Sequence, residues 1–205
     1  MKRTGTLMMT RLIACALALG VALPALAQQA NSADKHKHDH DVKKPTEGVA
    51  VLLPTKGNDV RGVILLRQEG DTVHLRGKVW NLSPGKHGFH IHQFGDLRAA
   101  DGKSAGGHFS PNDHPHGGPD DAKHHAGDFG NITANEEGVA MVEKQSKDLK
   151  LHFAIGRAIV VHEKADDLKS QPSGDAGARI AIGVIGFANI EDHDSARAPS
   201  DTSVR

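Results

Sequence analysis

Cysteine is nearly absent from this chain: Cys15 is the only one among 205 residues. It lies within residues 1–27, a segment that we expect to be removed during export, so the mature chain can form no disulfide bond. Exported proteins work in oxidising compartments, where disulfides commonly stabilise the fold. This protein must therefore obtain the corresponding stability from other interactions.

An excess of one charge and a long apolar segment are also absent. The chain has 25 basic and 25 acidic residues, and removal of residues 1–27 takes away Lys2, Arg3 and Arg11. The mature chain then carries a net charge of about −3, which does not suggest a nucleic-acid partner. The apolar run at residues 12–23 is too short to span a bilayer comfortably, so we expect no membrane span.

Residues 1–27 have the pattern of a signal peptide. Basic residues precede the apolar run, and Ala25-Leu26-Ala27 supplies small residues at a cleavage point. The alternative is a lipoprotein signal in which Cys15 is acylated and kept. Arg11 lies directly before Leu12-Ile13-Ala14-Cys15 and the apolar run follows the cysteine, which argues against that alternative. We therefore expect a periplasmic or secreted protein whose mature chain starts near Gln28.

Two polar segments flank the rest of the mature chain. Residues 28–47 are rich in Lys, His and Asp and predict a flexible arm, with His36, His38 and His40 at alternate positions. The arm is either a solvated tether or a segment that collects metal ions, since clustered imidazoles bind copper and zinc. Both interpretations stay open. Residues 191–205 are polar and predict a flexible C-terminal tail.

Short apolar runs separated by turn residues begin at Gly48. Residues 73–80 alternate apolar and polar side chains with period two, which predicts a strand with one buried face. Strands are expected at residues 49–53, 60–66, 73–82, 88–94, 138–143, 149–155, 158–162 and 179–188. Without intervening helices they predict an antiparallel sandwich or flattened barrel. Two longer loops, residues 95–130 and 164–178, are the expected places for function.

The histidines are informative through their placement. His90 and His92 lie two apart on an expected strand, so their side chains leave the same face and can bind one ion. The first long loop supplies four further candidate ligands: His108, His116, His125 and Asp128. Three imidazoles and a carboxylate suit tetrahedral zinc. His162 ends a second apolar run and could reach the first pair, and a set of imidazoles without sulfur suits copper.

Five sequence segments contain these candidates, in this order: Gly88–Asp96 (GFHIHQFGD), Ser104–Phe109 (SAGGHF), His116–Pro119 (HGGP), His125–Asp128 (HAGD) and Val161–Asp167 (VHEKADD). Together they resemble the copper,zinc superoxide dismutase family, from about Gly48 to Ile190. The resemblance implies an all-β, eight-stranded antiparallel Greek-key barrel with copper and zinc as cofactors. It also implies an enzyme that disproportionates superoxide to oxygen and hydrogen peroxide.

The resemblance further implies a role for each matching residue. The implied ligands are His90, His92 and His162 for copper, His108 as a bridge between both metals, and His116, His125 and Asp128 for zinc. Asp166 corresponds to the carboxylate that links a ligand of each metal by hydrogen bonds. Arg179 corresponds to the arginine at the mouth of the copper channel.

Neighbouring histidines are alternatives at two of these positions. His124 adjoins His125, and His114 lies two residues before His116. The motifs His-x-Gly-Asp and His-Gly-Gly-Pro favour His125 and His116. Of the remaining histidines, we expect His87 to bond the main chain.

The chain departs from the resembled family in its two loops. Family members tie the metal-binding loop to the barrel with a disulfide, and the corresponding positions here are Gly102 or Lys103 and Ile182. Within the second loop, the segment at residues 167–178 is shorter than in the eukaryotic branch of that family. Three other segments, Phe94-Gly95, Ile155–Arg157 and Gly183–Gly186, resemble the eukaryotic-type dimer contact and imply a homodimer.

Two other functions compete with this enzyme. One is a protein that stores or delivers copper and zinc on the same fold, which would be favoured by a missing copper ligand or a missing Arg179. The other is a copper-only enzyme, which would be expected to lack His116, His125 or Asp128. All of these residues are present, so the sequence favours an enzyme that uses both metals.

Overall fold

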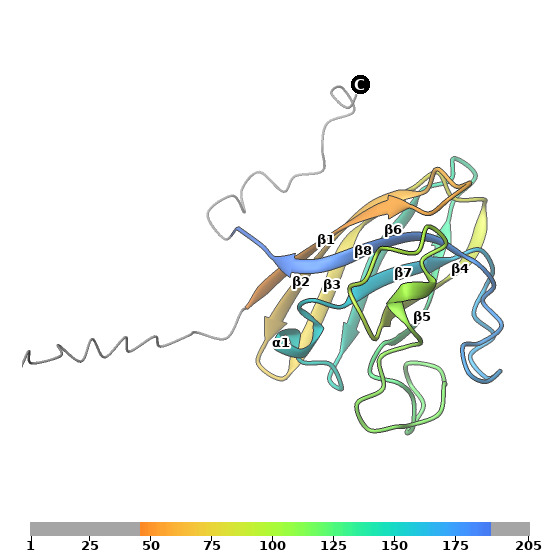
Figure 1. Cartoon of the computed structure of the whole chain (residues 1–205). Helices are drawn as coiled ribbons and strands as arrows, with labels where there is room; N and C mark the ends of the chain where they lie inside the picture. The colour runs from red at the N-terminus through yellow and green to blue at the C-terminus, as the bar shows by residue number, and fades with distance from the viewer. Residues whose placement is uncertain (1–45, 190–205) are drawn as a thin grey trace, which may run out of the picture. The chain divides into compact units, whose positions relative to one another are not determined.

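The computed structural model describes residues 46–189, which contain eight strands (Figure 1). They are β1 (Glu47–Pro54), β2 (Arg61–Glu69), β3 (Thr72–Trp80), β4 (Gly85–His92), β5 (Asp128–Ala134), β6 (Ala140–Ser146), β7 (Ala158–His162) and β8 (Arg179–Phe187). They close into a barrel in the order β1-β2-β3-β6-β5-β4-β7-β8, and each neighbouring pair is antiparallel. The pairing of β3 with β6 and of β4 with β7 is a Greek-key connection. The predicted eight-stranded barrel is confirmed.

Several predictions for the chain ends lie outside the described residues. These are the signal peptide at 1–27 with Cys15, residues 28–45 of the expected arm with His36, His38 and His40, and the tail at 191–205. β1 begins at Glu47, the last residue assigned to the arm. Within residues 46–189, no helix is long and apolar enough to cross a membrane.

Two predictions within the barrel are wrong. The segment expected as a strand at residues 149–155 contains instead a short helix, α1 (Leu151–Ala154). Its buried residues are three apart, as in a helix, but a single turn is too short to produce a readable period. The first long loop is also shorter than expected, because β5 begins at Asp128 and pairs with β4. Gly130 and Asn131 interrupt the apolar pattern of β5, so the sequence does not show this segment as a strand.

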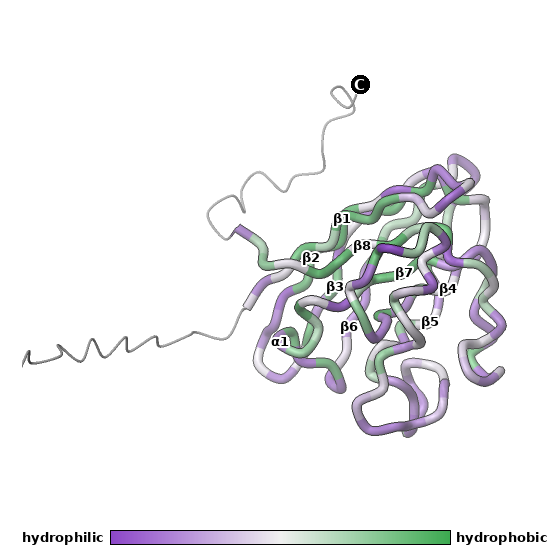
Figure 2. The backbone as a smooth tube through the Cα atoms, in the orientation of Figure 1, coloured by the Kyte–Doolittle hydropathy of each residue, from purple (hydrophilic) through white to green (hydrophobic). Residues whose placement is uncertain are grey.

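The main apolar core fills the barrel. Leu52, Ile64 and Leu75 of the first three strands are fully buried, and Phe89 of β4 meets Phe129 of β5 edge to face with ring centroids 6.3 Å apart. In Figure 2, β1, β7 and β8 carry the hydrophobic colour, whereas the long loops are mostly hydrophilic. Each such buried side chain contributes roughly 1.5–3 kcal/mol. The core therefore fixes the strands from which the candidate ligands project.

The pairing between β5 and β6 is the shortest in the barrel. Among the described residues, their register pairing is confined to Ala134 and Ala140. β5 pairs with β4 over a longer stretch, which ends where Asp128 lies opposite His90. β5 is thus held mainly along one edge.

Packing helps to anchor the first long loop, residues 93–127, to the barrel, and residues 46–189 contain no cysteine. The loop contains a short 3-10 helix, η1 (Lys103–Ala105). Four buried residues form a small cluster separate from the main core: Ala105, Ala158, Val160 and Ile182. Ile182 therefore supplies apolar contact to the loop at a position that corresponds to a cysteine in the resembled family.

Candidate metal centre

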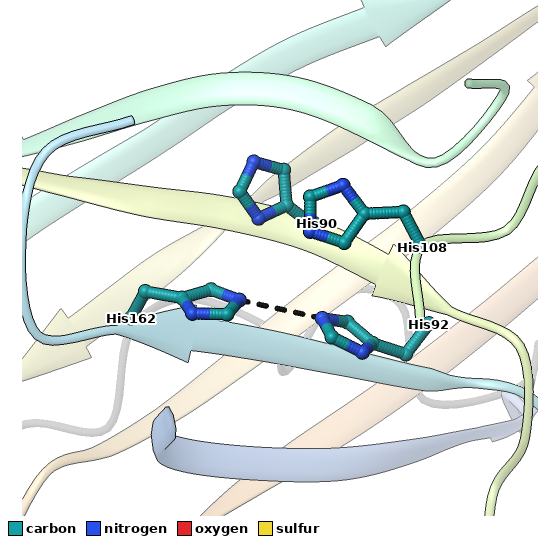
Figure 3. A group of neighbouring side chains, drawn as sticks. All are labelled: His90, His92, His108 and His162. Atoms are coloured by element: carbon teal, nitrogen blue, oxygen red, sulfur yellow. Dashed lines mark hydrogen bonds between the residues drawn. The ribbon is translucent and has the colours of Figure 1, made fainter. Parts of the chain in front are cut away.

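Four histidine side chains meet beside β4 and β7 (Figure 3). His90 and His92 come from β4, His162 ends β7, and His108 comes from the first long loop. An isolated bridge between His92 and His108 brings this loop residue to the strand. All four side chains are buried, and one ligand nitrogen of each lies within 4.8 Å of the others.

Hydrogen bonds determine which nitrogen of His92 and of His162 carries a proton. His92 donates from Nδ1 to the carbonyl of Gly106 (2.9 Å), and His162 donates from Nδ1 to the carbonyl of Gly177 (3.2 Å). A carbonyl oxygen only accepts, so Nε2 of each neutral ring is without a proton. These two Nε2 atoms lie 3.3 Å apart, as the dashed line in Figure 3 marks. Two bare acceptors at this distance repel each other unless a proton or a cation lies between them.

His90 and His108 add two further bare nitrogens. His90 donates from Nε2 to Asp166 Oδ2 (2.8 Å), and His108 Nδ1 lies 2.7 Å from Asp128 Oδ1. The opposite atoms, His90 Nδ1 and His108 Nε2, are buried and have no hydrogen-bond partner among the described residues. Because buried polar atoms are normally paired, these atoms indicate a missing ligand. The group supplies four imidazole nitrogens without sulfur, which suits copper.

A second group adjoins the first and shares His108 with it. Its members are His108, His116, His125 and Asp128. Asp128 Oδ1 contacts Nδ1 of His108 at 2.7 Å and Nδ1 of His125 at 3.1 Å. Asp128 Oδ2 lies 3.1 Å from His116 Nδ1, and this buried nitrogen has no hydrogen-bond partner in the described part of the chain. Three imidazoles and one carboxylate form the donor set that tetrahedral zinc prefers.

Asp166 connects the two groups. Its Oδ2 accepts from His90 Nε2 (2.8 Å), and its Oδ1 accepts from His116 Nε2 (3.0 Å). The side chain of Asn131 accepts from the main-chain N–H of Asp166 (2.7 Å) and donates to the carbonyl of Asp166 (2.9 Å). Asp166 therefore orients one ring of each group, and partners of this kind tune metal affinity.

Burial and neighbouring charges set the protonation of the centre. Burial lowers the pKa of His162 to about 3 and that of His108 to about 4, and the surrounding imidazoles add to the effect. Both rings are therefore neutral near pH 7 and can bind a cation. Burial also disfavours the charged form of His116, but Asp128 and Asp166 outweigh it and raise its pKa to about 9. A cation bound in the second group replaces this proton.

Arg179 lies at the start of β8, paired with His162 in the sheet. Its Nη1 donates to the carbonyl of Gly102 and its Nη2 to the carbonyl of Gly106, which also accepts from His92. Burial is the main cause of the low pKa of His92, and the positive charge of Arg179 contributes to it. The half-buried guanidinium is therefore fixed in position and close enough to act on the first group electrostatically.

Comparisons with known proteins agree with this geometry. Residues 60–185 match the family model described as copper/zinc superoxide dismutase. The chain belongs to the copper/zinc superoxide dismutase family. Cu-Zn superoxide dismutase 3 of Arabidopsis thaliana is 42% identical over 153 residues, which cover 70% of this chain and 93% of that protein. Cu-Zn superoxide dismutase A of Xenopus laevis is 45% identical over 148 residues, which cover 67% and 97%.

A solved structure is also similar to this member of the superoxide dismutase family. The crystal structure of the clock protein EA4 has a TM-score of 0.65 and 38% sequence identity, and the match covers 71% of this chain and 96% of that one. Copper and zinc are the cofactors of the family, and two groups that could hold them lie side by side here.

The structure brings together all seven residues that the sequence singled out as ligands: His90, His92, His108, His116, His125, Asp128 and His162. The alternatives lie outside both groups. His124 bonds to the carbonyl of His125 (2.7 Å) and lies 3.4 Å from Asp148, and His114 bonds to the carbonyl of His124 (3.3 Å). The geometry thus agrees with the motifs in favouring His116 and His125.

Several groups that orient these rings belong to the main chain or to the second loop. The prediction for His87 is confirmed, because its Nδ1 lies 2.8 Å from the carbonyl of His162. The carbonyls of Gly106 and Gly177 could not be identified from the sequence. Every residue has a carbonyl, so the residue type does not show which carbonyls bind a ring. Gln171, whose side chain bonds the main chain of His116, could not be identified either.

Proposed function

We propose that the protein is a superoxide dismutase that disproportionates superoxide to oxygen and hydrogen peroxide. One observation carries the proposal: two adjoining ligand groups share the ring of His108, and the first directs bare, buried imidazole nitrogens toward one another. The names of the relatives, Cu-Zn superoxide dismutases from a plant and a frog, support the same activity.

The donor sets fit the two metals in different ways. His90, His92, His108 and His162 would hold copper, and His108, His116, His125 and Asp128 would hold zinc. Asp128 supplies the negative charge that neutral imidazoles lack, which favours a divalent cation in the second group. The unpaired buried nitrogens in both groups would gain the partner that burial otherwise denies them.

Copper in the first group supplies one-electron redox chemistry, by which one superoxide is oxidised to oxygen and the next is reduced to the level of peroxide. Arg179 orients the anion. The carbonyls of Gly102 and Gly106 hold its guanidinium before the substrate arrives, so the positive charge needs no rearrangement. A guanidinium has five N–H donors, and those that the two carbonyls do not use remain for the anion.

His108 moves the proton that the product requires. Its Nδ1 is turned toward Asp128 in the second group, and its Nε2 faces the first group. Because Nδ1 is turned toward Asp128 and Nε2 has no hydrogen-bond partner in the described residues, Nε2 would be the ring atom that takes up a proton and releases it to the departing peroxide. His90 and His92 stay oriented by their bonds to Asp166 and Gly106.

Measuring metal content and turnover together tests this function. The protein loaded with both metals is expected to hold one ion in each group and to remove superoxide in proportion to its copper content. Binding of both metals without turnover would support the alternative, a protein that stores or delivers copper and zinc. Full turnover without zinc would support a copper-only enzyme.

The substitution Asp128→Ala is expected to weaken zinc binding by at least about tenfold. Burial opposes ionisation of this carboxyl, but the imidazoles of His108, His116 and His125 hold its pKa well below the ordinary range, so it is charged. Competition with a chelator measures the affinity, and Asp120→Ala, which removes an exposed carboxylate from the same loop, is the matched control. Normal zinc affinity in Asp128→Ala would show that the assignment of the second group is wrong.

The protein is also proposed to form a homodimer. The exposed large apolar side chains of residues 46–189 include Val51, Leu53, Phe94, Phe153 and Phe187. Gly95 lies against the main chain of Gly156 and the side chain of Val184, so the three segments that resemble the family's dimer contact are adjacent. A second copy would cover these apolar groups. Light scattering is expected to give twice the mass of one chain, and a monomer mass at micromolar concentration would contradict the proposal.

Export to the periplasm or the exterior is proposed from residues 1–27, which have the signal-peptide pattern. N-terminal sequencing of the exported protein is expected to begin near Gln28. A mature chain that retained Cys15 would support the lipoprotein alternative.

A further inference from the structure

The second long loop, residues 163–178 between β7 and β8, folds back on itself. The side chain of Asp167 accepts hydrogen bonds from the main-chain N–H groups of Lys169 (2.9 Å) and Ser170 (2.8 Å). The N–H of Asp167 donates to the carbonyl of Gly174 (2.8 Å), and the N–H of Gly174 donates to the carbonyl of Ser170 (2.6 Å). Residues 167–174, part of the blue loop that joins β7 to β8 in Figure 1, therefore form a closed turn that contains Gln171.

Gln171 reaches the first long loop with both ends of its carboxamide. Its Oε1 accepts from the main-chain N–H of His116 (2.9 Å), and its Nε2 donates to the carbonyl of the same residue (2.8 Å). The opposite amide orientation would place donor against donor and acceptor against acceptor, so the contact specifies a group that both donates and accepts. A carboxylate of the same length can only accept.

His116 depends on such a contact because it lies in no strand or helix. Its ring is held at Nε2 by Asp166, and its Nδ1 is the buried, unpaired atom that faces the second group. Gln171 fixes the main chain of the same residue. The second loop therefore restrains His116 at two points, at the ring through Asp166 and at the backbone through Gln171.

Gly174 completes this arrangement. It has a positive φ of +66°, and a Cβ atom there would overlap the carboxylate of Asp166 and lie 2.7 Å from His116 Nε2. The main chain of the closed turn thus packs directly on the bond between Asp166 and His116. The turn that presents Gln171 and the ring that it positions are parts of one packed unit.

We propose that Gln171 is a positioning residue of the second group. By holding the second loop against the main chain of His116, Gln171 slows the release of zinc. The inference rests on the proposed function, because it takes His116 to be a zinc ligand. Partners that orient a ligand typically contribute about 10- to 100-fold to metal affinity. A ligand whose backbone is free to shift would hold its ring less well, even though its bond to Asp166 remains.

The experiment compares zinc release from the full-length protein loaded with copper and zinc and from two variants, Gln171→Ala and Gln171→Glu. Transfer of zinc to a chromogenic chelator at pH 7 gives the rate. Gln68→Ala is the matched control. Gln68 on β2 also pairs its amide with main-chain groups, accepting from Leu151 (2.9 Å) and donating to Gly70 (2.9 Å), and it belongs to neither ligand group.

We expect zinc release to accelerate about tenfold in Gln171→Ala and at least as much in Gln171→Glu, where a carboxylate oxygen faces the carbonyl of His116. Gln68→Ala is expected to stay within about twofold of the parent protein, by the same reasoning. Equal release rates in Gln171→Ala and Gln68→Ala would overturn the inference. A parent protein that binds no zinc through His116 would instead overturn the proposed function, so the two failures are distinguishable.

Discussion

Replacing His162 by alanine is expected to reduce superoxide turnover to the background rate while zinc stays bound. His162 Nε2 is one of four imidazole nitrogens in the first group and lies 3.3 Å from His92 Nε2. Without it, copper would lose a fourth of its ligands and the tetragonal nitrogen set that suits its redox chemistry. The second group does not include His162, so zinc content should be preserved. Turnover per bound copper, with metal analysis, measures the effect.

The companion substitution His90→Ala is expected to abolish turnover and also to disturb zinc. Loss of the His90 ring leaves Asp166 Oδ2 without its partner, and the same carboxylate orients His116. The control is His152→Ala, which removes an exposed imidazole from α1. If either ligand variant retained normal activity with copper bound, the copper group would be misassigned.

Removal of copper and zinc is expected to lower the melting temperature by about 16–32 °C. An ion that binds only the folded state at a thousandfold its Kd stabilises it by about 4 kcal/mol, so two ions contribute about 8 kcal/mol. For a domain of this size, 1 kcal/mol corresponds to about 2–4 °C. In the metal-free protein, buried atoms such as His90 Nδ1 and His108 Nε2 lack partners, and no cysteine follows Cys15 to tie the first loop to the barrel. Calorimetry of the two forms measures the difference.

The control for that experiment is the melting temperature of the metal-bound protein in the presence of a thiol reductant. The reductant is expected to leave this temperature unchanged, because residues 28–205 contain no cysteine. The reductant must neither strip nor reduce the metals. A metal-free protein that melted within a few degrees of the metal-bound form would contradict the prediction. Packing of Ala105 against Ile182 would then suffice to fix the loop.

The barrel could be predicted largely because its strands repeat with a period of two. Residues 73–80 show this pattern plainly, and they form most of β3. An element that is too short or too polar shows no such period, as in α1 and in β5 with its Gly130 and Asn131. A four-residue helix and an interrupted strand have the same appearance in sequence as a loop.

The candidate site could be predicted as a set of ligands but not as a bonded network. His90 and His92 were identified from their spacing on one strand, whereas Asp166 and Arg179 were assigned only from family resemblance. Gln171 had no signal at all. Its partner is the main chain of His116, 55 residues away, and backbone partners leave no trace in the identity of the residue that provides them.

Because β5 pairs little with β6, zinc binding would also affect the stability of the sheet. β5 is bound along β4, meets β6 at Ala134 and Ala140, and carries Asp128 at its opposite end. A zinc ion held by Asp128 would therefore stabilise one end of β5, a strand that pairs little with its neighbour β6. Where a sheet opens, unpaired N–H and C=O groups become a template for another chain. We therefore expect the metal-free protein to aggregate edge to edge more readily than the zinc-bound protein, so zinc would protect its solubility as well as its catalytic site.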